Sequence, residues 1–474
     1  MFNGAMGNRG IDTLDHTLSE ETSAFSAQES APDRWNRVAE SSSSGSSELK
    51  ALFRPQPITD FATAGLNPAV VESLVVKLLQ SVGMASGRRI AHELGLPFRL
   101  LPEFLCQLQN RKIVNLANAA AANDFDYTLT DIGRARAASY LDECAYVGTA
   151  PVPFSDYVAA VAAQTITCEY PKQADLRRAF ADLLIPEQMF RTLGPAINSG
   201  QGMFLFGSPG NGKTSIAERV TLCFGRTVWI PRVLDIEGQI VKLFDLACHQ
   251  PITADGNGRL RNDVPDARWV EIKRPTIVAG GELTMDSLEI RYDPVTRVSE
   301  APFQMKSNNG LFLIDDFGRQ KMPPADLLNR WIMPLEKRYD HLSLANGKKI
   351  RVPFDQLIIF STNLDPSNLV DEAFLRRIPY KIEMHDPTEP QFRQIFAALA
   401  AKIGFPNVDV TALDYLIEHH FRRCGRPLRY CHPRDLLLQI KNHCVYNDLP
   451  LKLKPEYFDV AASNYFTGTT YKTD

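Results

Sequence analysis

The stretch MFLFGSPGNGKT, residues 203–214, joins a short apolar run to a glycine-rich loop that ends in lysine and threonine. An apolar tetrapeptide followed by G-x-x-x-x-G-K-T is the Walker A pattern in the strand-to-helix setting that this motif requires. Its glycines let the backbone curl so that successive N–H groups face phosphate oxygens, and the next helix adds its positive N-terminal end. The alternative, a glycine-rich turn before an ordinary helix, does not account for the lysine and threonine. The stretch therefore predicts a nucleotide-binding protein.

The side chains of this loop have separate expected roles. Lys213 is placed to reach the β- and γ-phosphates, and Thr214 to hold Mg²⁺. The residues predicted to contact the nucleotide are Gly207, Ser208, Pro209, Gly210, Asn211, Gly212, Lys213, Thr214 and Ser215.

A second apolar run, residues 311–314, ends in the carboxylates Asp315 and Asp316. An acidic pair after a strand is usually a solvated turn, but behind a Walker A loop it is typical of a Walker B motif. We expect Asp315 to hold the Mg²⁺ shell and Asp316 to orient and polarise the attacking water. The predicted metal ligands are thus Thr214 and Asp315.

Short apolar runs recur along the chain, at residues 203–206, 227–230, 311–314, 357–360 and 380–384. Continuously apolar strands of this length are typical of a parallel sheet that helices cover on both faces. The runs therefore predict an α/β core.

Three further segments complete the pattern: the run 357–360 followed by Ser361-Thr362-Asn363, then FLRRIP at 374–379, and HPRDLL at 432–437. In this order the motifs resemble those of the AAA+ ATPase family over roughly residues 175–460. The resemblance implies that Asn363 is the sensor 1 residue and that Arg434 is sensor 2, in a small helical lid. It also implies ATP as the nucleotide and a ring, usually a hexamer.

The resemblance further implies that Arg376 and Arg377 are an arginine-finger pair that reaches the nucleotide of a neighbouring subunit. A planar guanidinium suits that role because it stabilises the charge that spreads over phosphate oxygens during transfer. Taken alone, however, Arg376 and Arg377 also fit a solvated basic pair, and Arg434 fits a surface arginine at a helix start.

One position departs from the family pattern. Most AAA+ proteins carry glutamate after the Walker B aspartate, whereas this chain carries Asp316, which is one methylene shorter. We therefore expect hydrolysis to be slower, and an ATP switch with little turnover stays open as an alternative.

The region before the core carries its own pattern. Asn67-Pro68 starts a helix with an apolar stripe, and further helices are predicted at 88–94 and 100–110. Strands at 112–116 and 126–129, separated by an alanine-rich turn, and a helix at 130–140 follow. This order resembles a winged helix-turn-helix. The third helix carries few positively charged residues, so a protein-docking role is favoured over DNA binding. An unrelated helical domain is the third alternative.

The predicted fold class is α/β: an AAA+ P-loop parallel sheet with a C-terminal helical lid, preceded by a small winged-helix-like α+β domain. The predicted boundaries are a disordered serine-rich tail at 1–55, the winged-helix-like domain at 60–145, a linker at 146–174, the nucleotide-binding core at 175–388 with an insertion at about 250–309, and the lid at 389–474. A hairpin at 342–352, centred on Asn346-Gly347, resembles the pre-sensor hairpin of the MoxR-like and helicase-type branches. A plain surface hairpin is the alternative.

Composition limits the remaining function classes. The 474 residues carry a formal net charge of −3, which argues against a chain that coats nucleic acid through bulk charge. No run approaches the roughly 18 apolar residues of a membrane span, so we expect a cytoplasmic protein with no membrane span. Eight scattered cysteines predict reduced thiols, and the trio Cys424, Cys431 and His432 fits no common zinc spacing.

Two function classes follow. In the first, Mg-ATP hydrolysis by a ring drives the remodelling or regulation of a protein client that the N-terminal domain selects. In the second, the chain is a nucleotide-dependent DNA-binding regulator that contacts DNA through residues 60–145. A kinase built on the same loop is disfavoured by Asn363, the arginine pair and Arg434 taken together.

Overall fold

The computed structural model describes residues 53–120, 124–225, 227–252 and 265–466. The serine-rich tail predicted at 1–55 lies outside the described residues except for its last three positions.

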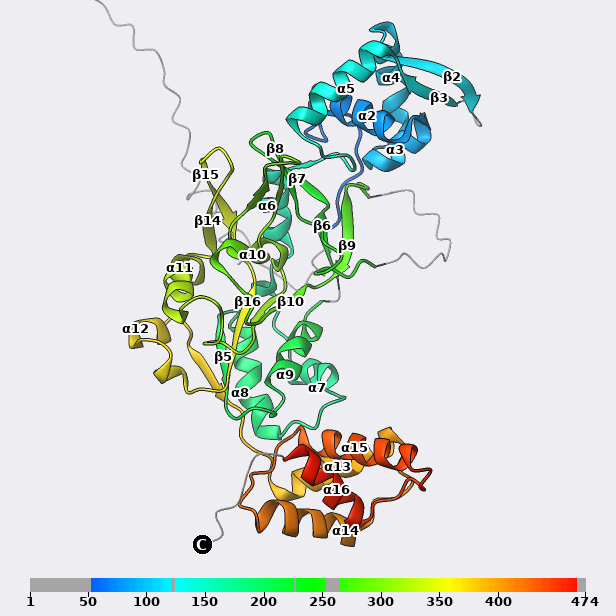
Figure 1. The fold of residues 1–474 in the computed structure, drawn as a ribbon. Helices are drawn as coiled ribbons and strands as arrows, with labels where there is room; N and C mark the ends of the chain where they lie inside the picture. Colours follow the sequence, from blue (N-terminus) through cyan, green and yellow to red (C-terminus); the bar gives the residue numbers. More distant parts are fainter. Residues whose placement is uncertain (1–52, 121–123, 226, 253–264, 467–474) are drawn as a thin grey trace, which may run out of the picture. The chain divides into compact units, whose positions relative to one another are not determined.

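The N-terminal region consists of helices and a small antiparallel sheet with strand order β1-β3-β2 (Figure 1). Its elements are α2 (Pro68–Val82), β1 (Met84–Ser86), α3 (Gly87–Leu94), α4 (Leu101–Asn110), β2 (Val114–Ala120), β3 (Asp124–Leu129) and α5 (Asp131–Glu143). The side chain of Asn67 caps α2 by accepting a hydrogen bond from the Ala69 amide, as the Asn-Pro pair predicts. Of the segment predicted as a turn, residues 117–120 belong to β2 and residues 124–125 to β3, whereas residues 121–123 lie outside the described residues.

The central sheet has five parallel strands in the order β10-β13-β16-β5-β17. These strands are β5 (Met203–Phe206), β10 (Thr276–Ala279), β13 (Leu311–Ile314), β16 (Leu357–Thr362) and β17 (Tyr380–Glu383). The strand β5, which precedes the predicted Walker A loop, lies between β16 and β17. The strand β13, which precedes the predicted Walker B carboxylates, is the other neighbour of β16. Because the sheet is parallel, these four strands end at the same edge.

Successive residues of these strands point to opposite faces, and both faces are buried. One face packs on α7 (Gln173–Ala179), α8 (Glu187–Asn198) and α9 (Lys213–Val220), and the other packs on α11 (Pro324–Lys337). Phe312, Trp331 and Phe360 interlock in the second layer with ring centroids 5.5 to 6.2 Å apart. The parallel α/β core predicted from the apolar runs is confirmed.

One predicted core strand is wrong. The run at 227–230 forms β6 (Thr227–Pro231), which pairs antiparallel with β9 (Trp269–Lys273) outside the central sheet. The strand next to β13 is instead β10. This strand was not predicted from the sequence, because it has only four residues, follows Arg274-Pro275 and includes the exposed Val278.

The segment between Walker A and Walker B contributes further strands to a second sheet of order β11-β12-β8-β7-β4. Its strands are β4 (Val152–Pro153), β7 (Val233–Ile236), β8 (Gln239–Lys242), β11 (Arg291–Asp293) and β12 (Val298–Glu300). The strand β4 and the helix α6 (Phe154–Ala163), with its buried Tyr157, come from the segment predicted as a linker. The hairpin predicted at 342–352 is present as β14 (Tyr339–Ser343) and β15 (Lys349–Pro353).

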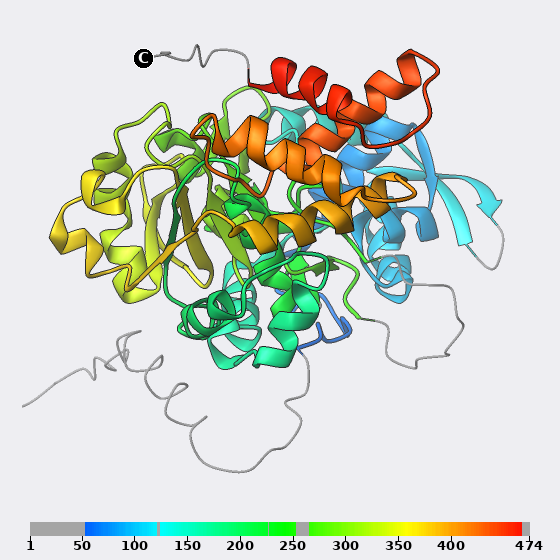
Figure 2. The same cartoon turned by 90° about the horizontal axis from the view of Figure 1, so that it is seen from below.

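The C-terminal region is helical, as predicted (Figure 2). Its helices are α13 (Glu389–Ile403), α14 (Val410–Tyr415) continued by a wider turn over Leu416–Arg422, α15 (His432–Tyr446) and α16 (Pro455–Tyr465). They enclose their own apolar core, to which Phe396, Leu437 and Phe458 contribute fully buried side chains. Together with the parallel sheet, this region confirms the predicted α/β fold class with a helical C-terminal region.

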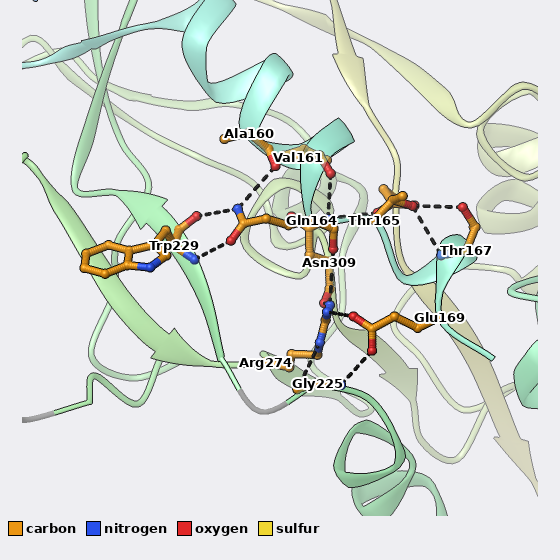
Figure 3. Close-up of polar contacts among 11 residues, drawn as sticks. Ala160, Val161, Gln164, Thr165, Thr167, Glu169, Gly225, Trp229, Arg274 and Asn309 are labelled. Carbon is orange, nitrogen blue, oxygen red and sulfur yellow. Dashed lines mark hydrogen bonds and ion pairs between the residues drawn. The ribbon is translucent and has the colours of Figure 1, made fainter. Parts of the chain in front are cut away.

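A buried polar network lies at the amino-terminal edge of the central sheet, opposite the edge that carries the Walker motifs (Figure 3). Arg274, Asn309 and Asp355 each stand two residues before a core strand. The Arg274 guanidinium donates to the carbonyls of Gly225 at 2.9 Å and Asn309 at 2.6 Å and forms an ion pair with Glu169. The Asp355 carboxylate accepts from Thr165 at 2.7 Å and from the Asn309 amide group at 2.9 Å.

This network connects the α6 segment to the sheet, so its loss should destabilise the protein. Arg274→Met leaves Glu169 and two carbonyls without their cationic partner, and breaking such a pair costs about 3 kcal/mol. We expect that decrease in the free energy of urea unfolding, measured by tryptophan fluorescence. Arg291→Met is the matched control, since it removes an exposed ion pair with Glu300 and should cost less than about 1 kcal/mol. Equal losses in the two variants would contradict a structural role for the network.

Candidate nucleotide site

A cavity of about 1150 Å³ lies at the carboxyl ends of β5 and β13. Parallel α/β sheets place their ligand sites at this edge. The cavity lining includes the loop and helix start from Pro209 to Ile216 together with Asp315, Asp316, Asn363 and Arg434. Gly207 and Ser208 line an adjoining hollow of about 320 Å³, which they share with Asn363. The structure therefore brings the predicted Walker A, Walker B, sensor 1 and sensor 2 residues to one place.

Two glycines of the loop are required by close contacts. Gly207 has φ 127°, and a Cβ there would stand 2.6 Å from the Met384 carbonyl oxygen. Gly210 has φ 84°, and a Cβ there would stand 2.5 Å from the Cys431 sulfur. Any larger residue would have to displace its neighbour and adopt an unfavourable backbone conformation.

Lys213 begins α9 and is buried within the loop. Its Nζ donates to the carbonyl oxygens of Gly207 at 2.9 Å and Ser208 at 3.0 Å, and to Asn363 Oδ1 at 2.6 Å. Burial lowers the pKa of Lys213, and the nearby Asp315 and Asp316 act in the opposite direction. The ammonium group is thus held between the loop and sensor 1, where it can neutralise phosphate charge.

Thr214 and Asp315 meet as a magnesium site requires. Thr214 Oγ1 donates to Asp315 Oδ2 at 2.8 Å, so a hydroxyl and a carboxylate oxygen face the same position. Mg²⁺ prefers hard oxygen ligands and is commonly held by one or two protein groups together with substrate phosphates and water. The donor set fits this ion.

Asp316 is exposed and has a left-handed backbone with φ 49°. Asn363 Nδ2 donates to Asp316 Oδ1 at 3.2 Å, which links sensor 1 to the proposed base. The Gln320 amide group fixes this turn by donating to the carbonyl oxygens of Asp315 at 3.0 Å and Asp316 at 3.2 Å. Residues in such strained conformations cluster at active sites.

The three predicted arginines differ in position. Arg434 lines the cavity from the start of α15, and its Nε donates to Asp435 Oδ1 at 3.0 Å. Arg376 and Arg377 follow α12 (Glu372–Leu375) and are not among the residues that line the cavity of their own chain. Arg376 is 79% exposed beside Glu372, and Arg377 pairs with Glu336 at 2.6 Å.

Sequence reasoning missed several residues at this site. Arg319, Tyr430 and Asp386 line the cavity. Asp386 also accepts a hydrogen bond from Asn211 of the phosphate loop and pairs with Arg429. A signal was present for Asp386, since it follows the apolar run 380–384 and therefore falls at the same edge of a parallel sheet. Arg319 stands four residues after Asp315, in the loop that a Walker B strand leads into. Arg429 and Tyr430 carried no signal beyond their closeness to Arg434.

The weak zinc alternative finds no support in the described residues. No cluster of three or more histidine, cysteine, aspartate or glutamate side chains there could hold a metal ion. His432 lies among Phe421, Tyr465 and Phe466, and burial lowers its pKa to about 4. All eight cysteines are free thiols, as predicted.

Comparisons with known proteins are consistent with this architecture but distant. A family model described as a domain of unknown function (DUF8689) matches residues 388–464, the helical C-terminal region. No curated protein matches the sequence. None of the helices in the described part of the chain is long and apolar enough to cross a membrane.

Several solved structures are similar over part of the chain. NtrX from Brucella abortus in complex with ATP has 12% identity and a TM-score of 0.39, covering 64% of this chain and 60% of its own. A RuvB mutant from Thermotoga maritima has 11% identity and a TM-score of 0.35, covering 60% of this chain and 71% of its own. A complex of the magnesium chelatase subunits BchI and BchD has 14% identity and a TM-score of 0.28, covering 61% and 91%.

The chain thus spans about 60% of the length of the NtrX structure. Because all three TM-scores lie below 0.5, we base the fold class on the parallel sheet and on the places that its motifs occupy. These define a P-loop α/β protein.

Proposed function

We propose that this chain is a Mg-ATP-dependent ATPase of the AAA+ family, whose nucleotide cycle remodels or regulates a protein partner. One observation carries the proposal: five polar side chains that follow three different strands come together at a single cavity. They are Lys213, Thr214, Asp315, Asp316 and Asn363. Three hydrogen bonds join them, from Lys213 to Asn363, from Thr214 to Asp315 and from Asn363 to Asp316.

Each residue has a role in the proposed reaction. The loop amides and Lys213 would bind the β- and γ-phosphates, and Arg434 would contact the γ-phosphate from the lid. Thr214 and Asp315 would hold Mg²⁺, which supplies charge neutralisation and orientation of the phosphates. Asp316 would accept a proton from the attacking water, and Asn363 would hold the Asp316 carboxylate in place.

We further propose that Arg376 and Arg377 act on the neighbouring subunit of a ring, a hexamer by family resemblance, rather than on their own nucleotide. Their absence from the lining of their own cavity supports this direction. Arg376, at 79% exposed, is available to an adjacent surface.

A mixing experiment tests the trans action of this pair. The double variant Arg376→Ala/Arg377→Ala and the variant Asp316→Asn should each be inactive alone, since the first lacks the finger and the second lacks the base. Mixed in equal amounts, they should recover about a quarter of the wild-type ATPase rate, because a random ring pairs an intact base with an intact finger at that fraction of interfaces. Arg423→Ala, an exposed arginine beside Glu418, is the control and should leave the rate unchanged. No recovery on mixing would contradict action between subunits.

The N-terminal region favours a protein partner over DNA. Its element order is that of a winged helix, with α4 as the helix that would read a groove. Two arginines at the ends of that helix are already engaged: Arg99 donates to the Ile58 carbonyl at 2.6 Å, and Arg111 pairs with Glu72 at 2.6 Å. The helix α4 itself carries no lysine or arginine for phosphate contacts. We therefore place client selection in this region and keep DNA-binding regulation as the alternative.

A further inference from the structure

Two segments that are distant in sequence enclose the phosphate loop. Residues 384–386 follow β17 on one side, where the Met384 amide donates to the Phe206 carbonyl at 2.7 Å. Residues 429–431 precede α15 on the other, where the Cys431 amide donates to the Gly210 carbonyl at 3.0 Å. The first segment leads into the lid and the second belongs to it.

One ion pair joins these two segments to each other and to the loop. Arg429 contacts Asp386 Oδ1 at 2.7 Å, and the same oxygen accepts a hydrogen bond from Asn211 Nδ2, also at 2.7 Å. Asn211 Nδ2 further donates to the Met384 carbonyl at 3.1 Å. The Asn211 side chain is buried, with 2% exposed, so it has no solvent to replace these partners.

Asp386 and Arg429 carry opposite charges at neutral pH. Burial raises the pKa of the Asp386 carboxyl, but the hydrogen bonds from Arg429 and Asn211 outweigh this effect and leave the pKa below its usual value. Asp386 is therefore ionised at neutral pH. The Arg429 side chain is 18% exposed and the Asp386 side chain 37%, so the pair is partly screened by water.

We propose that Asp386 and Arg429 are positioning residues that couple the lid to the phosphate loop through Asn211, so that nucleotide affinity depends on the ion pair between them. The inference rests on the proposed nucleotide binding. Arg429 is not among the residues that line the cavity, and its ion pair with Asp386 links it to Asn211. The Asn211 peptide supplies one of the N–H groups of the loop, and a side chain held at two acceptors fixes the direction of that peptide.

The test uses the full chain and a fluorescent ATP analogue with Mg²⁺. Arg429→Gln and Asp386→Asn should each weaken binding about tenfold, and the double variant should be no weaker than the worse single variant, because the two residues act as a unit. Asp386→Asn keeps an acceptor for Asn211 but also removes a charge from the cavity wall, so Arg429→Gln is the variant that isolates the ion pair. Arg429→Lys, which keeps the charge, should bind within about threefold of wild type. Arg423→Gln is the lid control, since Arg423 pairs with Glu418 and is not among the residues lining the nucleotide cavity.

Hydrogen exchange separates this role from a general loosening of the lid. In Arg429→Gln, the amides of residues 207–214 should exchange faster, whereas Arg423→Gln should leave them unchanged. Two results would overturn the coupling: binding within twofold of wild type in both single variants, or additive losses in the double variant. Either result would leave the proposed nucleotide binding standing, provided that wild type still binds more tightly than Lys213→Ala. If wild type binds no better than Lys213→Ala, the proposed function fails and this inference fails with it.

Discussion

Lys213→Ala is expected to weaken Mg-ATP binding by about a hundredfold or more, the largest effect of any single change in this protein. The reason is that the Lys213 ammonium is the one buried cation within the loop. Truncating one partner of a buried charge pair typically costs about 3 kcal/mol, which is roughly a hundredfold in affinity. Isothermal titration calorimetry of wild type and variant measures the difference directly.

The variant also removes hydrogen bonds to the carbonyls of Gly207 and Ser208, so its fold must be verified by circular dichroism. Lys349→Ala, on the exposed face of β15, is the matched control and should bind as wild type does. A folded Lys213→Ala protein that keeps wild-type affinity would show that the nucleotide, if bound, lies elsewhere.

Asp316→Asn is expected to lower the turnover of Mg-ATP by at least about a hundredfold while affinity stays within about threefold of wild type. An amide cannot accept the proton of the attacking water. General-base catalysis typically accelerates a reaction by about a hundredfold or more, so turnover should fall by at least that factor. Asparagine tolerates the left-handed backbone at this position and can still accept the hydrogen bond from Asn363, so the fold of the turn should persist. Single-turnover phosphate release, measured beside equilibrium binding, separates the two quantities.

Asp326→Asn, an exposed carboxylate in the first turn of α11, serves as the control and should leave turnover unchanged. Wild-type turnover in Asp316→Asn would remove Asp316 as the base. Loss of binding in the same variant would instead assign Asp316 to the metal shell together with Asp315.

The sequence predicted those parts of the site that are local. The Walker A loop is one continuous stretch, and the Walker B and sensor 1 residues each follow an apolar strand, so the shared edge of a parallel sheet places them together. The contact between Asp386 and Arg429 spans 43 residues and joins the end of a strand to the start of a lid helix. No local pattern encodes such a pairing.

For the fold too, local features were predicted and long-range pairings were not. Strands β5, β13, β16 and β17 were predicted, because each is an apolar run bounded by polar residues. Strand β10 was missed and the run at 227–230 was assigned to the wrong sheet, since a short apolar run does not specify its neighbour. The Gln164 side chain bonds both backbone groups of Trp229 in β6, a long-range contact that the local sequence of the run does not indicate.

The rate of Mg-ATP hydrolysis per subunit, measured over a wide range of wild-type concentrations, tests the central claim most directly. A site completed by arginines of a neighbouring subunit predicts a rate that rises with concentration and then levels off as rings form. Tight ATP binding with no phosphate release at any concentration would contradict the ATPase and leave a nucleotide switch in its place.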